Sequence, residues 1–292
     1  MNNLDLSERR KAWTSMSLDP VALRQAYAHD GAVLIPKALD ATALAQAQAA
    51  YDWSLANPGP GATRFAQATD STFYNDLYNP RCLEGYRAML ETSPIPAIVA
   101  GLWDAGEVWF MYEQVFLKEG GETRRTPWHQ DSSYLTVAGA HLAVAWISFD
   151  VQSAADSLEF VRGSHKGPLY NGSRFELGDD TAPINPTSPL PRLPDIEGTR
   201  SDWDIVSWAV EPGDLVVFHP ATLHGGAPTH PGKRRRTLTL RFFGADAVYD
   251  QRPGRAGPRV SGFHDRLRQG DPFRDPSFLR LLPRAASMVA AT

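Results

Sequence analysis

From about Glu107 onward, the chain consists largely of short apolar segments separated by glycine and proline turns, and this pattern limits the folds open to it. The segments are rich in β-branched and aromatic residues, which favour strands. We expect strands at residues 108–112, 114–117, 142–149, 158–161, 214–218 and 237–243. Strands spaced in this way predict a sandwich, a barrel or a jelly roll.

The first part of the chain carries helix signals instead. Asp19 can cap a helix that has Pro20 at its first position and ends near Gly31. A short buried strand should follow at residues 32–35. Asp40 can cap a second, alanine-rich helix that runs to about residue 56, and a third helix is expected at 80–90.

The expected domain organisation is simple. Residues 1–17 are polar and predict a flexible N-terminal arm, and residues 18–292 predict a single domain. Within that domain, a proline-rich stretch around residues 166–204 contains no strand signal. A connection of this length is usually functional or disordered, so we predict a lid-like insertion.

The tripeptide His129-Gln130-Asp131 is the strongest sign of chemistry. Because side chains alternate along a strand, His129 and Asp131 point to one side and Gln130 to the other. One strand would thus offer an imidazole and a carboxylate to a single metal ion. A histidine from a distant segment would complete two histidines and one carboxylate, a set typical of non-haem Fe(II) oxygenases.

Residues 218–226 contain two candidates for this second histidine, His219 and His224. An odd separation means that both cannot face the same way if the segment is extended. Glycines follow His224 and would let backbone and small ligands approach a metal closely. From the residues alone, the two histidines remain equal candidates.

Arg235 precedes a strand whose two faces differ. One face carries Arg235, Thr237, Thr239 and Arg241, and the other face carries leucines and a phenylalanine. A guanidinium at the end of a polar face suits a dicarboxylate, which it binds through two charge-assisted hydrogen bonds. The alternative is that the three consecutive arginines at 234–236 all face solvent.

Charge and composition exclude several classes of protein. The net charge is −4, whereas a nucleic-acid binder would be strongly basic. The apolar runs are too short to span a bilayer, so we expect no membrane partner. A single cysteine, Cys82, rules out an intrachain disulfide, and no leader of basic and then apolar residues is seen. Both features favour a reducing cytoplasm.

Five segments occur in a characteristic order: His-Asp-Gly-Ala-Val-Leu-Ile-Pro at 29–36, Thr-Pro-Trp-His-Gln-Asp at 126–131, Trp-Ile-Ser-Phe-Asp at 146–150, residues 158–166, and residues 212–241. With them, the chain resembles the phytanoyl-CoA dioxygenase family of Fe(II)- and 2-oxoglutarate-dependent oxygenases over most of residues 20–245. The resemblance implies a mainly β fold. This would be a double-stranded β-helix, a distorted and cupin-like jelly roll, with the N-terminal helices packed on its outside.

The resemblance also implies the metal ligands. It makes His129, Asp131 and His224 the iron ligands, and it favours His224 over His219 because the family's ligand directly precedes a small residue. Arg235 matches the arginine that pairs with the far carboxylate of 2-oxoglutarate. Further contacts to this co-substrate are implied for two residues that lie on predicted strands, Ser148 and Tyr112.

Four residues are candidates for contacts with the substrate. The aromatic side chains of Tyr134 and Trp146 would form walls of the pocket. Either Arg162 or Arg241 would recognise an acidic group, such as a carboxylate, a phosphate or a CoA ester. The equal alternative is that each is a surface salt-bridge partner.

The activity implied by the resemblance is that of a dioxygenase that uses Fe(II), 2-oxoglutarate and O2. It would hydroxylate a small molecule and release succinate and CO2. Two other functions fit the same ligands. A Zn(II) hydrolase would use a metal-bound water and would not need Arg235. A cupin-like binding protein would hold a metal and small acids without turnover.

Overall fold

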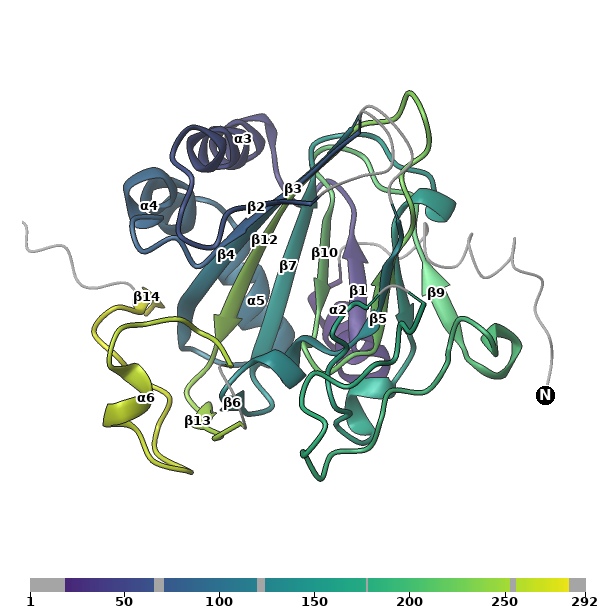
Figure 1. The fold of residues 1–292 in the computed structure, drawn as a ribbon. Coiled ribbons are helices and arrows are strands. Elements are labelled where there is room, and N and C mark those ends of the chain that lie inside the picture. Colours follow the sequence, from purple (N-terminus) through teal and green to yellow (C-terminus); the bar gives the residue numbers. More distant parts are fainter. Residues whose placement is uncertain (1–18, 66–70, 120–123, 177, 253–255, 284–292) are drawn as a thin grey trace, which may run out of the picture.

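Two β-sheets face each other in the computed structural model, which describes residues 19–65, 71–119, 124–176, 178–252 and 256–283 (Figure 1). The larger sheet has eight strands in the order β1-β10-β7-β12-β4-β3-β2, with β14 paired to β4. The smaller sheet has the order β5-β11-β8-β9, and β6 pairs with β13 separately. This is the distorted jelly roll, or double-stranded β-helix, that the resemblance implied, so the predicted fold class is confirmed.

The strands of the larger sheet are β1 (Ala32–Ile35), β2 (Thr63–Phe65), β3 (Thr72–Leu77), β4 (Val108–Glu119), β7 (Leu142–Ser148), β10 (Leu215–Phe218), β12 (Arg235–Phe243) and β14 (Leu279–Leu282). Those of the smaller sheet are β5 (Thr126–His129), β8 (Leu158–Val161), β9 (Ile205–Ser207) and β11 (His224–Gly226). The separate pair is β6 (Val137–Ala138) and β13 (Val248–Tyr249).

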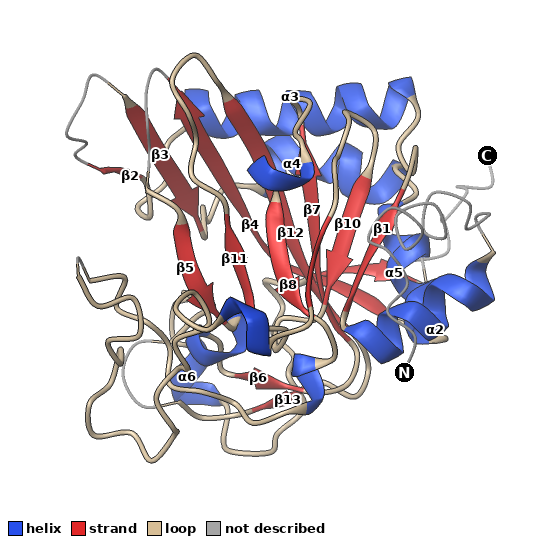
Figure 2. Cartoon of the chain, turned by 90° about the vertical axis from the view of Figure 1, so that its right-hand side faces the viewer, coloured by secondary structure: helices blue, strands red, loops and turns tan. Residues whose placement is uncertain are grey.

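Helices cover the outer face of the larger sheet, as Figures 1 and 2 show. They are α2 (Pro20–Asp30), α3 (Ala41–Ala56), α4 (Leu83–Thr92) and α5 (Ile95–Trp103); a short α6 (Phe263–Arg266) lies near β6 and β13. The predicted caps are confirmed, because the side chains of Asp19 and Asp40 accept hydrogen bonds from the N–H groups of Val21 and Ala43.

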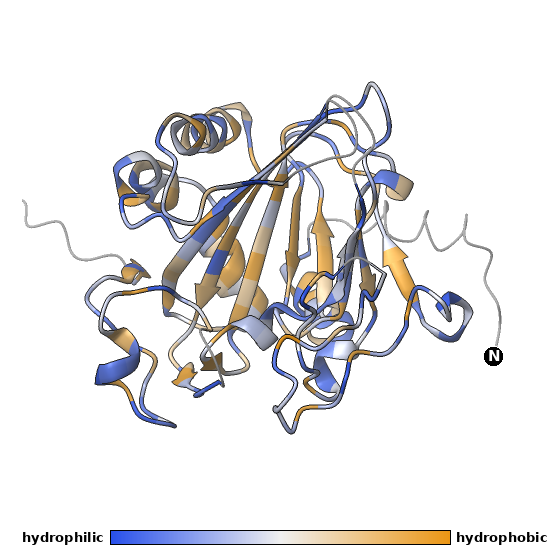
Figure 3. Ribbon diagram, in the orientation of Figure 1, coloured by the Kyte–Doolittle hydropathy of each residue, from blue (hydrophilic) through white to orange (hydrophobic). Residues whose placement is uncertain are grey.

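The two faces of β12 show how the sequence builds this layering. Leu238, Leu240 and Phe242 pack beneath the helices in the main hydrophobic core. Thr237, Thr239 and Arg241 alternate with them and face the smaller sheet, as predicted. The central strands of the larger sheet are largely hydrophobic (Figure 3). A second apolar cluster, which includes Trp146, fills the space between the sheets.

Several boundaries differ from the predictions. The two segments at 108–112 and 114–117 form one strand, β4, and α4 begins at Leu83 rather than at residue 80. Helix α5 was not predicted, although its buried residues Ile95, Val99 and Leu102 recur at helical spacing. The predicted arm at 1–17 lies outside the described residues. No helix in the described ranges is both long and apolar enough to cross a membrane.

The proline-rich stretch at 166–204 contains no long element. Short 3-10 turns lie at its two ends, at Ser164–Lys166 and Arg200–Asp202. Its backbone contacts the segment after β5, where Ser133 Oγ donates to the carbonyl of Tyr170. Farther along, Glu197 accepts a hydrogen bond from Nε1 of Trp128. The stretch therefore lies against the same part of the chain as the His129-Gln130-Asp131 tripeptide.

Candidate metal centre

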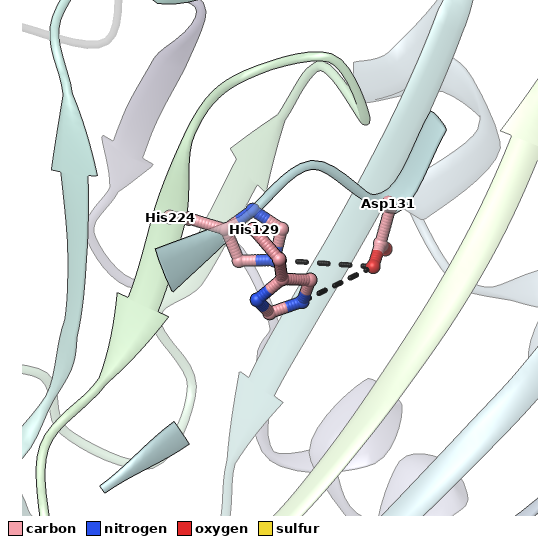
Figure 4. Close-up of side chains that lie close together, drawn as sticks. All are labelled: His129, Asp131 and His224. Carbon is pink, nitrogen blue, oxygen red and sulfur yellow. Dashed lines mark ion pairs between the residues drawn. The ribbon is translucent and has the colours of Figure 1, made fainter. Parts of the chain in front are cut away.

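Three side chains from two distant segments converge inside the smaller sheet. His129 is the last residue of β5, and His224 is the first residue of β11 and lies directly opposite it in the strand pairing. Asp131 opens the 3-10 turn that follows β5. Its Oδ1 lies 3.6 Å from Nε2 of His129 and 3.9 Å from Nε2 of His224 (Figure 4). One potential ligand atom from each residue lies within 4.8 Å of the others, so a single metal ion could bind all three.

The local backbone differs from the prediction at one point. Asp131 does not continue the strand, because β5 ends at His129. Gln130 is nevertheless extended, with φ −115° and ψ 126°, so the side chains on either side of it still converge. The Gln130 side chain points elsewhere, donating to the carbonyl of Ala221 at 2.8 Å and accepting from the N–H of Tyr170 at 2.8 Å.

Both imidazoles are oriented by backbone carbonyls. Nδ1 of His129 donates to the carbonyl of Pro127 at 2.8 Å, and Nδ1 of His224 donates to that of Thr222 at 2.9 Å. Because a carbonyl only accepts, each Nδ1 carries a proton, and Nε2 is the nitrogen of each ring that is left to bind a metal. Burial, with the neighbouring His129, lowers the pKa of His224 to about 3. His224 is therefore neutral, as a metal ligand must be.

Asp131 is held on its other side by Arg241. Oδ2 accepts hydrogen bonds from Nε of Arg241 at 3.1 Å and from Nη2 at 2.8 Å, while Oδ1 faces the histidines. Burial by itself would raise the pKa of Asp131, but the Arg241 charge and the two histidines bring it far below its usual value. An ionised carboxylate and two imidazoles with Nε2 turned toward it are a donor set that suits Fe(II).

The structure decides between the two candidate histidines. The ring of His219 lies 5.7 Å from that of His165, and its Nδ1 accepts a hydrogen bond from the N–H of Ala221 at 3.1 Å. It is not part of the cluster that could hold a metal, whereas His224 is. The choice that the residues alone left open thus falls on His224.

Two buried cations lie on the same inner face of the larger sheet as Arg241. Arg235 of β12 lies opposite Lys118 of β4 in the strand pairing. Arg235 is 9% exposed and Lys118 is 2% exposed. The guanidinium of Arg235 donates to the carbonyls of Asp156 and Ala227, each at 2.8 Å. Nζ of Lys118 donates a hydrogen bond to the carbonyl of Arg124 at 3.4 Å. Arg235 therefore does not lie in solvent, which excludes that alternative.

This pair of cations has electrostatic consequences. Burial lowers the pKa of Arg235 to about 10, and burial together with the Arg235 charge lowers that of Lys118 well below its usual value. Across the described ranges, neither side chain forms an ion pair with a carboxylate. Buried charges without a countercharge are costly, so this position favours an anion. A cavity of about 340 Å³ borders Arg235, with Gln152 and Thr229 also in its wall.

The other two residues predicted to bind the co-substrate already have partners. The hydroxyl of Ser148 donates to the carbonyl of Asp150 at 2.6 Å and accepts from Nε2 of Gln152 at 2.5 Å. The ring of Tyr112 lies 4.6 Å from the Arg241 guanidinium and stacks on Tyr78, with 3.9 Å between ring centroids. Both lie on strands of the larger sheet, and their contacts with a co-substrate stay predictions.

Aromatic side chains lie beside the candidate ligands. The ring of Tyr134 is 6.0 Å from that of His129, and its hydroxyl donates to the carbonyl of Ser173 in the proline-rich stretch. Phe175, from the same stretch, lies 5.4 Å from the His129 ring and stacks on Tyr134. Its side chain is partly open to solvent. Trp146 is buried in the cluster between the sheets.

The two arginines predicted to contact the substrate both form ion pairs within the chain. Arg162 forms ion pairs with Asp30, at the end of α2, and with Asp204. Arg241 donates to Asp131, as described above. These contacts fit the salt-bridge alternative, and recognition of an acidic substrate stays a prediction.

Two residues of the site, and the role of a third, were missed in the sequence. Lys118 shares its strand face with Tyr112 and Gln114, but the predicted strand ended before it. The role of Arg241 as partner of Asp131 depends on a contact between segments far apart in the chain. Phe175 lies in a loop that gives no periodic signal. Strand alternation, continued by one residue, could have identified the first of these.

Comparison with known proteins gives a family and a set of relatives. The sequence model described as "Phytanoyl-CoA dioxygenase (PhyH)" matches residues 27–237. The chain is 29% identical over 131 residues to a probable alpha-ketoglutarate-dependent hypophosphite dioxygenase of Stutzerimonas stutzeri, a match that covers 41% of this chain and 40% of that protein. It is 29% identical over 134 residues to the peroxisomal phytanoyl-CoA dioxygenase of Homo sapiens, a match that covers 44% of this chain and 37% of the human protein. The matches thus span about two fifths of these relatives.

Solved structures share the fold over nearly the whole chain. The carbocyclase SnoK from nogalamycin biosynthesis, a non-haem alpha-ketoglutarate-dependent enzyme, has a TM-score of 0.66 at 22% identity, with 92% of this chain and 97% of SnoK covered. The apoform of EctD from S. alaskensis has a TM-score of 0.62 at 15% identity, with 88% and 91% covered. At these identities the likeness supports the fold alone.

Proposed function

This chain belongs to the phytanoyl-CoA dioxygenase family, and on that premise we propose that it is an Fe(II)- and 2-oxoglutarate-dependent dioxygenase that hydroxylates a small molecule. The observation that carries the proposal is the convergence of His129, Asp131 and His224 in a buried cluster of metal-ligand spacing. When bound, iron and 2-oxoglutarate would supply the oxidising chemistry and release succinate and CO2.

The chain's own residues prepare this site. Backbone carbonyls fix the two imidazoles with Nε2 toward Asp131, so little ordering is left for metal binding. Arg241 keeps the Asp131 carboxylate ionised and oriented. Such fixed second partners usually matter for metal affinity almost as much as the ligands themselves.

Arg235 and Lys118 would hold the far carboxylate of 2-oxoglutarate. Arg235 on β12 and Lys118 on β4 lie on the same face of the larger sheet as Arg241. A dicarboxylate chelated at the metal would extend toward them. Binding an anion there would compensate two buried positive charges. Ser148, which lies opposite Thr237 on the adjacent strand of that face, and Tyr112 are further candidates for the same ligand. A zinc hydrolase would not require this second, cationic position.

The substrate would enter beside Tyr134 and Phe175. These stacked rings lie next to His129 and offer an apolar surface, of which Phe175 is partly exposed. We therefore propose a small molecule with an apolar portion, and we assign Trp146 to the inner wall. Residues 166–204 would act as a lid of the single domain, and a reducing cytoplasm fits the free thiol of Cys82.

The test is succinate release by the purified chain with Fe(II), 2-oxoglutarate and O2, screened with small apolar and acidic molecules. A His224→Ala variant should lose iron binding and succinate release. His219→Ala, five residues away and outside the cluster, is the matched control and should retain both. Full activity of the His224→Ala variant would refute the site, and the absence of 2-oxoglutarate consumption with every substrate would refute the activity.

A further inference from the structure

We propose that Arg241 is a positioning residue that restricts Asp131 to binding iron through one oxygen, which keeps coordination positions open for 2-oxoglutarate and O2. The inference rests on the proposed function and deepens it. A carboxylate can bind a metal through one oxygen or through both. Here a second metal–oxygen bond would occupy a position that the co-substrate or O2 needs.

The hydrogen bonds of Arg241 are unequal between the two oxygens of Asp131. Oδ2 accepts from Nε at 3.1 Å and from Nη2 at 2.8 Å. Oδ1 is the oxygen that lies 3.6 Å and 3.9 Å from the two histidine Nε2 atoms. A guanidinium fork that closes on one oxygen thus leaves the other to face the metal position.

Arg241 is itself held in place from several sides. Its Nη2 also donates to Oε1 of Gln114 at 2.8 Å, and Nε2 of Gln114 donates to Oδ1 of Asn75 at 2.9 Å. Its guanidinium lies 4.6 Å from the ring centroid of Tyr112. The residue is 6% exposed and belongs to β12, in the middle of the larger sheet. Oδ2 therefore cannot turn toward a metal without breaking a fixed ion pair.

These contacts also limit a direct role in substrate recognition. Nε and Nη2 of Arg241 are both committed to Asp131, and Nη2 is shared with Gln114. Nη1 is buried and has no hydrogen-bond partner among the described residues, so it is the one nitrogen of Arg241 left for another ligand. Through its other two nitrogens, Arg241 acts on Asp131.

An Arg241→Met variant tests the proposal. Under anaerobic conditions, Fe(II) affinity is measured by tryptophan fluorescence, and 2-oxoglutarate affinity is measured at saturating Fe(II) from the metal-to-ligand charge-transfer absorption. We expect iron affinity to fall about 10- to 100-fold, as for other losses of a residue that orients a metal ligand. We also expect weaker 2-oxoglutarate binding at saturating iron, because the freed Oδ2 competes for a position. A purely structural role would leave this second quantity unchanged.

The matched control is Arg236→Met. Arg236 lies five residues before Arg241 on the same strand and forms a similar ion pair with Asp150, but its side chain faces away from the site. We expect this variant to lose thermal stability while binding iron and 2-oxoglutarate as the parent chain does. Arg241→Lys keeps the charge without the fork and should restore part of the iron affinity.

The outcomes are distinct. Unchanged iron affinity in Arg241→Met would overturn the proposal. This holds even if 2-oxoglutarate binds more weakly, because Arg241 would then contact the co-substrate itself. If Arg241→Met does not fold, Gln114→Leu is the second variant, because it removes the hydrogen bond from Gln114 to Arg241 and keeps the ion pair with Asp131. This variant should bind iron more weakly, and unchanged iron affinity would overturn the proposal. If the parent chain binds iron but never 2-oxoglutarate, the proposed function fails, while the iron affinities still decide the role of Arg241.

Discussion

Replacing Glu113 with glutamine should stabilise the protein at alkaline pH and change little at acid pH. Glu113 lies on β4 with 2% of its surface exposed. Its Oε1 accepts a hydrogen bond from the N–H of Asn79 at 2.8 Å, and no described side chain supplies a cation to it. Burial raises the pKa of Glu113 from 4.5 to about 7, and nearby Asp76 adds to the effect.

The size and sign of the effect follow from this pKa. Between pH 4.5 and about 7 the folded protein holds the proton and the unfolded chain has lost it. The stability associated with Glu113 is therefore complete below pH 4.5 and is lost as the pH rises through about 7. At 1.36 kcal/mol for each pH unit, the full loss is about 3 kcal/mol. In a chain of this size this corresponds to roughly 6 °C in melting temperature.

The assay is thermal and urea unfolding of both proteins at pH 5 and pH 8. Glutamine can still accept the hydrogen bond from the N–H of Asn79, so the free energies of unfolding of the two proteins should be similar at pH 5. At pH 8, Glu113→Gln should be more stable than the parent chain. Glu91→Gln serves as a control, because Glu91 is exposed on α4 and pairs with Arg87, and its effect should stay below about 0.5 kcal/mol. A stability difference between Glu113→Gln and the parent chain that does not change with pH would refute the reasoning.

Two further predictions concern the anion position and one helix end. Lys118→Met and Arg235→Met should each raise the KM for 2-oxoglutarate about 10- to 100-fold, because each removes a buried charged donor. Iron affinity measured without 2-oxoglutarate should not change. An unaltered KM in both variants would contradict the assignment of this anion position. Gly31→Ala should lower stability by roughly 1 kcal/mol or more, since Gly31 has φ +78° and a Cβ there would lie 2.4 Å from Nδ1 of His165. Thermal unfolding would measure this, and an unchanged melting temperature would argue against a strained cap.

Much of the local structure could be predicted from neighbouring residues. The aspartates that cap α2 and α3 were correct because a cap depends on a hydrogen bond to a residue two or three positions away. The two faces of β12 were correct because alternation is a property of any extended strand. The pairing of His129 with Asp131 was predicted for the same reason, although the strand ends earlier than expected.

The remaining features depended on contacts between distant segments. Local sequence did not decide between His219 and His224, and the register of β11 against β5 and β8 brings His224 into the site. Arg162 and Arg241 were both interpreted as candidate contacts for an acidic substrate, but each pairs with an aspartate more than a hundred residues away, Asp30 for Arg162 and Asp131 for Arg241. Local sequence thus determined which side chains share a face of a strand, because that depends on backbone geometry within a few residues. Tertiary structure decided which faces meet and which charges become buried together, because strand register and sheet packing join residues that lie far apart in the chain.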